Sequence, residues 1–297
     1  MRSMGLIYGI LGFMCIPSLC FSDPWKYGLS YIKDFSSCAD GCRESKLRWA
    51  PDQMNQLDST LQSAGLSKKF KYSNTSVQST DVIEDYYNGY DHLYADSVKL
   101  YAITTHGGAL TTESGDKTYY ATYCSSGNPN YSSNLYDDQG NMIRCLATSK
   151  KMFFNERTHS SNNMYMQNTG SLRWLILSTC NSINSGPMGY WSGRFTYGLD
   201  YLLGYKNTMK LGETTDECLS DFASHAFGGN SKFKKVWFSG NDDWWIDNTA
   251  GVFTCGTLTA PGQADSEYRR DNYRKDWGER IINASGTYYC AWSWHEG

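Results

Sequence analysis

The stretch LRWLILSTCNS, from Leu172 to Ser182, decides the fold, because four apolar residues in a row are followed abruptly by a serine, a threonine, a cysteine and two more small polar residues. The run from Trp174 to Leu177 shows no alternation with polar residues. It therefore predicts a strand buried on both faces, as in a mainly parallel sheet covered by helices. Open sheets of this kind bind ligands at the carboxyl ends of their strands. We therefore expect Cys180 at a ligand-binding edge of the sheet.

A second stretch of the same shape, VKLYAITTHGG from Val98 to Gly108, ends in a histidine and two glycines. If the two strands are neighbours, their ends bring His106 and Cys180 together. A cysteine attacks as its thiolate, and a neighbouring imidazole favours that form by lowering the thiol pKa. The amide of Gly107 or Gly108 can approach a substrate carbonyl as an oxyanion hole, because no side chain obstructs it. The alternative interpretation is a core cysteine and a satisfied histidine that happen to end two strands.

The first 22 residues have the composition of a secretory signal peptide, with a positive charge at Arg2 and an apolar run from Gly5 to Leu19. This run is too short to form a typical transmembrane helix, and no later stretch approaches the roughly 20 apolar residues that such a helix needs. We expect a secreted or periplasmic protein with a single α/β domain over residues 23–297. A long polar insertion at about 109–170 is expected to wall or cover the cleft at the strand ends.

The charge balance argues against several classes of partner. The chain has 27 basic and 30 acidic residues, a formal net charge of -3, and no charge runs. Nucleic acids and anionic membranes attract basic patches, so neither is an expected partner. No metal or other cofactor is expected either. No second ligand pair follows Cys38 and Cys42, and the acidic cluster from Asn241 to Asp247 lacks the spacing of a calcium loop.

Eight cysteines follow the predicted signal peptide, namely Cys38, Cys42, Cys124, Cys145, Cys180, Cys218, Cys255 and Cys290. An exported chain oxidises those that lie close together. Cys124 and Cys145 bracket a polar segment, and a disulfide is predicted between them. Cys38 and Cys42 are expected to form a local disulfide or a helix-turn contact. If Cys180 is a free nucleophile, seven of these cysteines remain. Seven cysteines cannot all pair within one chain, so another thiol must be free or must form an intermolecular bond.

Further elements follow from periodicity and from turn residues. Pro51 begins a predicted helix with an apolar stripe, and Gly65 ends it. A capping box at Thr214 begins a second helix, which closes at Gly228. The remaining patterns predict a helix-like segment at Phe195–Leu203, a weak strand at Thr208–Leu211, and strands at Ala250–Cys255 and Thr287–Trp294.

The segments ITTHGG and LILSTCNS resemble the paired signatures of the caspase-like cysteine peptidases, which include caspases, clostripain and gingipains. In that group one strand ends in His-Gly and a later one in Cys, in the same order as His106 and Cys180. The whole chain more closely resembles an uncharacterised family of secreted bacterial proteins, with landmarks that include Tyr27, Gly28 and the segment GLDYLLGY. The resemblance implies a caspase-like three-layer α/β sandwich, with helices on both faces of the sheet, and a Cys-His dyad. It implies no particular substrate.

The sequence thus predicts a secreted cysteine peptidase that uses His106 and Cys180 to cleave peptide bonds in a peptide or protein substrate. The alternative is a noncatalytic binding protein for peptide or carbohydrate, since exposed rings among the 23 Tyr and 10 Trp residues can stack on sugars. Glu213 and Asp216 follow the next predicted strand, so they are expected to bind substrate and to favour a basic residue beside the cut. Both acids also suit the first turn of a helix, where the helix dipole favours negative charge.

Overall fold

The structure is a computed structural model that describes residues 25–39, 41–111, 117–136, 139–152, 171–183, 191, 199, 201–212, 215–228, 237–239, 241, 248–257 and 288–295. The predicted signal peptide, residues 1–22, lies outside these residues. Within the part that is described, none of the helices has the length and apolar character needed to cross a membrane.

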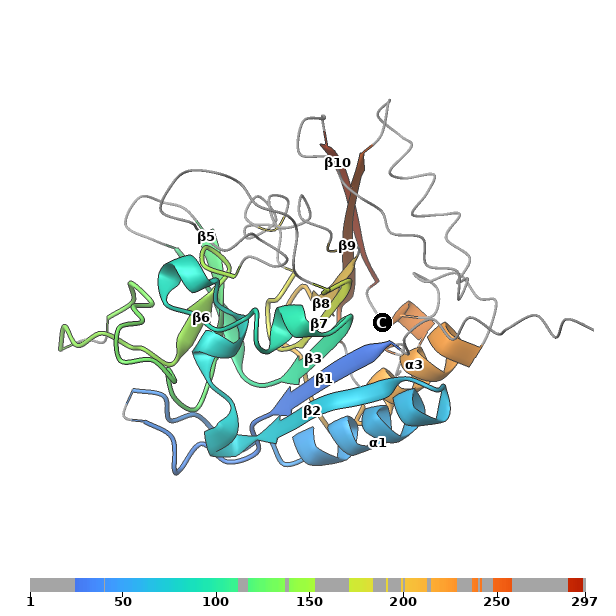
Figure 1. The fold of residues 1–297 in the computed structure, drawn as a ribbon, viewed down its shortest axis with the longest axis horizontal. Coiled ribbons are helices and arrows are strands. Elements are labelled where there is room, and N and C mark those ends of the chain that lie inside the picture. Colours follow the sequence, from blue (N-terminus) through green and yellow to red (C-terminus); the bar gives the residue numbers. More distant parts are fainter. Residues whose placement is uncertain are drawn as a thin grey trace, which may run out of the picture.

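Seven strands form the central sheet: β1 (Lys26–Tyr31), β2 (Ser67–Ser73), β3 (Leu100–Thr104), β7 (Trp174–Ser178), β8 (Tyr201–Tyr205), β9 (Ala250–Thr257) and β10 (Tyr288–His295). Their order across the sheet is β10-β9-β8-β7-β3-β1-β2 (Figure 1). The strands from β2 across β1, β3 and β7 to β8 are parallel. The β8–β9 and β9–β10 pairs at the other edge are antiparallel. The prediction of an α/β fold with a mainly parallel sheet is confirmed.

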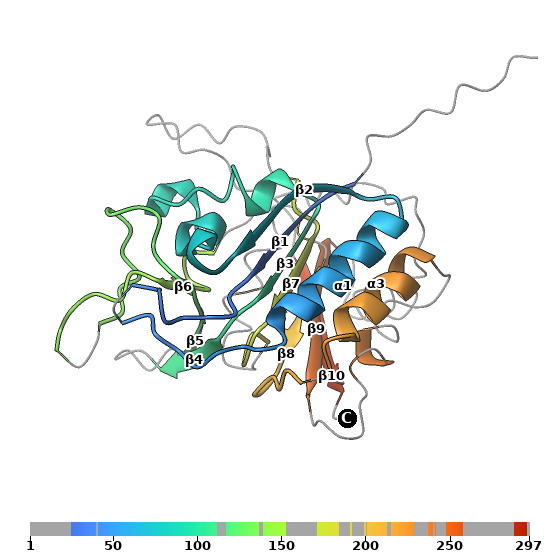
Figure 2. The ribbon, with the colours of Figure 1, turned by 90° about the horizontal axis from the view of Figure 1, so that it is seen from below.

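Two α-helices, α1 (Ala50–Ser63) and α3 (Cys218–Gly228), lie side by side on one face of this sheet (Figure 2). The apolar stripe predicted after Pro51 provides Met54, Leu57 and Leu61 to the core on that face, together with Trp174 and Ile176 of β7 and other buried residues. Alternate residues of each central strand therefore point into this core, which the helices complete.

The opposite face of the sheet is covered differently. A second, antiparallel sheet lies there, in the order β4-β5-β6, formed by β4 (Gly107–Thr111), β5 (Lys117–Thr122) and β6 (Leu146–Thr148). Four 3-10 turns between β2 and β3, at Asn74–Ser76, Ser79–Val82, Asp85–Tyr87 and Ala95–Ser97, complete the covering layer. The two α-helices whose ranges are described thus cover one face, and Trp191, a helical residue, packs into the core on the other face. The polar segment after β2 folds as short turns, and the described part of the expected insertion contributes to the second sheet.

Around β8 the structure overturns two predictions. Tyr201–Tyr205 is a central strand, although Phe195–Leu203 was predicted to be helix-like, and Thr208–Leu211 is not a strand. Leu202 packs into one core and Leu203 into the other, so an all-apolar run serves a strand that is buried on both faces. A short apolar run does not distinguish this arrangement from a buried helix.

Candidate functional site

The two strands that the sequence singled out are direct neighbours. β3 and β7 pair in parallel, with Thr104 opposite Ser178, and the amide of Thr105 continues the ladder by donating to the Ser178 carbonyl (3.4 Å). His106 and Cys180 each follow the last paired residue of their strand by two positions. The prediction that these strands are adjacent and parallel is therefore confirmed, and the two residues lie at the same edge of the sheet.

The His106 ring is held by a residue that the sequence did not suggest. Its Nε2 lies 2.8 Å from the Ser45 carbonyl oxygen and 3.2 Å from the Ser45 hydroxyl, and the ring centroid lies 5.2 Å from that of Phe35. A carbonyl oxygen only accepts, so Nε2 carries the proton in this contact. The neutral imidazole consequently has Nδ1 as its basic atom. No sequence signal pointed to Ser45, because its closer contact with the ring is through its backbone carbonyl.

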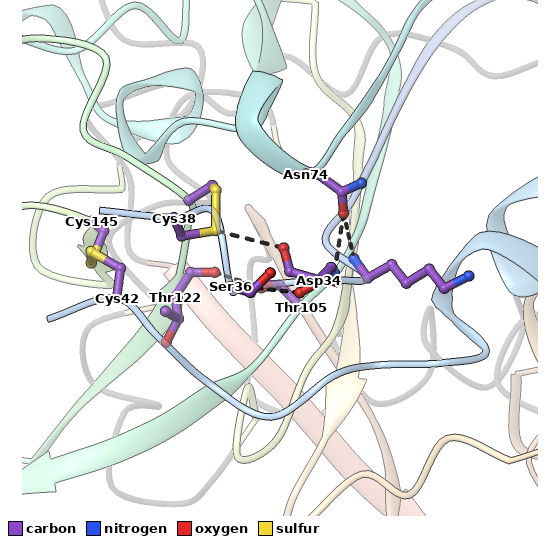
Figure 3. Close-up of a disulfide and its surroundings, with 10 residues drawn as sticks. Asp34, Ser36, Cys38, Cys42, Asn74, Thr105, Thr122 and Cys145 are labelled. Atoms are coloured by element: carbon purple, nitrogen blue, oxygen red, sulfur yellow. Dashed lines mark hydrogen bonds between the residues drawn. A yellow bond between two sulfur atoms is a disulfide. The ribbon is translucent and has the colours of Figure 1, made fainter. Parts of the chain in front are cut away.

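Ser45 belongs to the loop between β1 and α1, and two disulfides fix this loop (Figure 3). Cys38 is bonded to Cys124 and Cys42 to Cys145, with Cα–Cα distances of 4.5 and 5.9 Å. The predictions of a Cys124–Cys145 disulfide and of a local Cys38–Cys42 disulfide are both wrong. Cys124 and Cys145 do lie close together, since the Tyr123 amide donates to the Cys145 carbonyl (2.8 Å). Each of them is nevertheless bonded to a cysteine of the loop and not to the other.

Two disulfides in the described chain are consistent with a secreted protein, since such bonds persist in oxidising compartments. The start of the same loop is also anchored by hydrogen bonds. The amides of Lys33 and Asp34 donate to the Asn74 side-chain oxygen, at 2.9 and 3.2 Å (Figure 3). The loop that holds the His106 ring is thus attached to the rest of the molecule at several points.

Cys180 is a free, half-buried thiol. The Met209 amide donates to its Sγ at 3.3 Å, and the thiol lies 3.7 Å from the Met209 carbonyl oxygen. Burial raises the pKa of the Cys180 thiol, and the Met209 amide opposes this shift only in part. No hydrogen bond between Cys180 and His106 occurs within the part of the chain that the structure describes. The resting residue is thus a neutral thiol, which differs from the preformed thiolate expected from the sequence.

The chain turns sharply straight after Cys180. Asn181 has a φ of 58°, in the left-handed region that asparagine tolerates better than most residues. Its amide donates to the Asn207 carbonyl oxygen (2.8 Å). The Ser182 hydroxyl accepts from the Tyr205 amide (2.8 Å) and donates to the Leu177 carbonyl oxygen (3.1 Å). These contacts attach the turn to β7 and β8 and hold the thiol at the end of its strand.

The two glycines after His106 begin β4, and they differ in the direction of their amides. Thr122 donates its amide to the His106 carbonyl (2.9 Å), so the alternation of an antiparallel ladder turns the amide of Gly108 towards β5 and that of Gly107 away from it. A Cβ at Gly107 would lie 3.0 Å from the Cys180 carbonyl oxygen. Of the two predicted oxyanion donors, only Gly107 thus has an amide outside the β4–β5 ladder.

Tyr120 of β5 is a second residue of this region that the sequence did not suggest. It is half-buried, and a Cβ at Gly108 would lie 2.6 Å from its hydroxyl. Burial raises the pKa of Tyr120, and the nearby Glu44 and Cys180 add to the shift, so its hydroxyl remains a proton donor. The preceding Tyr119 points elsewhere and bonds the Thr179 hydroxyl at 2.6 Å. The polar composition of the insertion gave no reason to select either tyrosine.

Of the two acids predicted to bind substrate, Asp216 makes its contacts with α1. Asp216 is buried, and one of its carboxylate oxygens accepts from Gln56 of α1 (3.1 Å). Burial raises the Asp216 pKa, with smaller contributions from Glu217 and Asp52. Glu213 lies outside the described residues. Asp216 therefore has a packing role between the two helices, and its prediction as a cleft residue has no support in its contacts.

Fold and site together define an α/β protein with a free thiol and an oriented imidazole at the ends of two adjacent parallel strands. Throughout the described ranges, no group of three histidine, cysteine or acidic side chains could hold a metal ion. The chain belongs to the family described as a domain of unknown function (DUF6345), whose model matches residues 30–293. No curated protein matches the chain.

Proposed function

We propose that this protein is a secreted cysteine hydrolase with a caspase-like fold, in which Cys180 attacks the acyl carbon of a peptide or related substrate. The observation that carries the proposal is the register of β3 and β7, which puts His106 and Cys180 at equal distances beyond neighbouring parallel strands. The free state of Cys180, beside four cysteines that form disulfides, supports the same role.

The raised thiol pKa favours a mechanism in which the proton leaves during the attack. His106 Nδ1 accepts the thiol proton as Cys180 Sγ bonds to the acyl carbon, and the carbonyl π electrons move onto its oxygen. The Gly107 amide donates to that oxygen. The imidazolium then protonates the leaving amine, the C–N bond breaks, and a thioester remains. Water activated by the neutral imidazole hydrolyses the thioester and releases the thiol.

Alkylation of the unreduced mature protein with iodoacetamide at near-neutral pH tests the dyad directly. We expect Cys180 to react faster than Cys218, whose thiol is buried with a pKa raised to about 11 by that burial. The His106→Ala variant should slow the labelling of Cys180 several-fold without changing that of Cys218. Mass mapping that places Cys180 in a disulfide, or labelling that is indifferent to His106, would refute the dyad.

A peptide library then tests the reaction itself. Mass spectrometry of library digests should find cleavage by the wild type and none by the Cys180→Ala variant. The peptides that are cut would also show which residue is preferred beside the cut. Cleavage that survives in Cys180→Ala would assign the activity to another residue or to a contaminant.

A noncatalytic binding role is the second candidate, and a specific observation favours it. The thiol pKa is raised, and the thiol's hydrogen bonds are with Met209 rather than His106. In that case Cys180→Ala should bind peptide or glycan as tightly as the wild type does, and neither protein should turn it over. Calorimetric titration of both proteins with library peptides separates the two candidates.

A further inference from the structure

Gln53 of α1 is fully buried beneath the ends of the two site strands. Its side-chain oxygen accepts from the hydroxyls of Thr104 on β3 and Ser178 on β7, at 2.5 and 3.0 Å. Each hydroxyl lies two residues before a member of the dyad. A single amide oxygen therefore connects the two strands at the last pair before His106 and Cys180.

The amide nitrogen of Gln53 faces the other way, towards the segment that leads into α3. It donates to the Thr215 carbonyl oxygen (3.5 Å) and to Cys218 Sγ (3.4 Å). A carbonyl oxygen cannot donate, so the contact with Thr215 fixes which end of the Gln53 amide is nitrogen. Both lone pairs of the oxygen and both N–H groups then have partners, as a buried polar network requires.

The same network reaches the far side of Cys180. The Thr215 hydroxyl donates to the Lys210 carbonyl oxygen (3.2 Å), and the preceding residue, Met209, donates its amide to Cys180 Sγ. Gln53 is thus connected to the strand end that carries His106, to the strand end that carries Cys180 and to the segment that contacts the thiol.

We propose that Gln53 is a positioning residue that sets the spacing between His106 and Cys180 by holding the ends of β3 and β7 in one network with Met209, Lys210 and Thr215. The role rests on the proposed function, because it has a purpose only if imidazole and thiol act together. Substrate does not contact Gln53, which is buried beneath the sheet ends. Gln53 therefore affects how strongly the reactivity of Cys180 depends on His106, and not the chemistry of either side chain alone.

The test measures how strongly Cys180 labelling depends on His106, as the ratio of iodoacetamide rate constants with and without His106→Ala. In the wild-type background we expect a ratio of several-fold, and in the Gln53→Leu background a ratio close to one. Gln56→Leu is the matched control, because Gln56 lies one turn further along α1 and contacts Asp216 and Ser220 rather than the strand ends. It should keep the wild-type ratio.

Circular dichroism and thermal unfolding show whether Gln53→Leu is folded. If it folds, is less stable and keeps the wild-type ratio, Gln53 is only structural and the proposal is overturned. If it does not fold, the double variant Thr104→Val/Ser178→Ala removes the two strand hydroxyls while leaving α1 intact. An unchanged ratio in that variant would equally overturn the proposal. A ratio of one in the wild-type background would overturn the proposed function itself, and this role with it.

Discussion

At the scale of single residues, the candidate site combines a neutral thiol with an imidazole of fixed orientation. The Ser45 carbonyl holds the proton on His106 Nε2, and the Met209 amide donates to the thiol without overcoming the effect of burial. The proposed chemistry therefore depends on how closely the side chains of His106 and Cys180 can be brought together. Gly107 and Asn181, one beside each member of the dyad, control that approach.

Replacing Gly107 by alanine should separate the dyad. The new Cβ would lie 2.9 Å from Thr179 Cβ and 3.0 Å from the Cys180 carbonyl oxygen, and neither neighbour can turn aside. We expect a loss of about 1–3 kcal/mol of unfolding free energy, as for other overpacked sites, and a several-fold smaller dependence of Cys180 labelling on His106. Urea unfolding and iodoacetamide kinetics measure the two effects.

Gly108→Ala is the matched control for this change. There the close atoms belong to the end of the Tyr120 side chain, which can move away. It should alter stability and labelling less than Gly107→Ala does. The reverse order of effects would show that Gly107 is not the point of contact between the two strand ends.

Two substitutions at Asn181 should show whether its backbone conformation or its side chain contributes to stability. A β-branched residue at a φ of 58° is strained, so we expect Asn181→Val to lose roughly 1–2 kcal/mol of unfolding free energy. Asn181→Gly adopts this φ without strain and should stay close to the wild type in a denaturant titration. A large loss in both variants would instead assign the importance of Asn181 to its side chain.

At the scale of elements, the loop after β1 connects the two sheets. It carries the Ser45 carbonyl to His106, while its two cysteines bond to the second sheet region at Cys124 and Cys145. The central sheet thus carries the two residues of the proposed dyad, and the disulfides support the loop that contacts the imidazole. The two disulfides are not equivalent, because Cys42 is three residues from Ser45 and Cys38 is seven.

The two disulfides should therefore contribute similarly to stability and differently to the site. They close segments of 86 and 103 residues, so removing either should cost about 2–5 kcal/mol of unfolding free energy. We expect the Cys42→Ala/Cys145→Ala variant to weaken the dependence of Cys180 labelling on His106 more than Cys38→Ala/Cys124→Ala does. Thermal unfolding and alkylation rates compare the pair, and equal labelling in both would contradict the role of Ser45.

At the scale of the whole molecule, the sequence predicted the parts that depend on local pattern. Uniformly apolar runs predicted β3 and β7, and the stripe after Pro51 predicted α1. The adjacency of the two strands followed from their shape and separation. Segments governed by distant contacts were predicted poorly. The partners of Cys38 and Cys42 lie 86 and 103 residues away, and the structure of β8 depends on its neighbours on both sides.

The pH dependence of global stability should show a buried carboxyl group, Asp81. Burial raises its pKa to about 7, and the tyrosines around it, Tyr72, Tyr101 and Tyr123, have raised pKa values that keep them neutral. Because the folded state holds this proton more tightly than the unfolded state, the stabilisation is complete below about pH 4. It is lost as the pH rises through 7.

Asp81→Asn should remove this component, since an amide can still accept from the Gln78 amide and does not titrate. We expect the variant to gain stability relative to the wild type between about pH 4 and pH 8, by an amount on the order of 2–4 kcal/mol. Urea unfolding at a series of pH values measures the difference. Parallel curves for the two proteins would show that Asp81 has an ordinary pKa.

The two disulfides also have an order along the chain. Their four cysteines, at positions 38, 42, 124 and 145, all precede Cys180. A chain that crosses a membrane from its amino end would present these four to the oxidising side before the candidate nucleophile arrives. Both bonds could then close while no competing thiol from Cys180 is present, and the order of synthesis would protect the residue from mispairing. Nascent chains stalled between Cys145 and Cys180 should already contain both bonds.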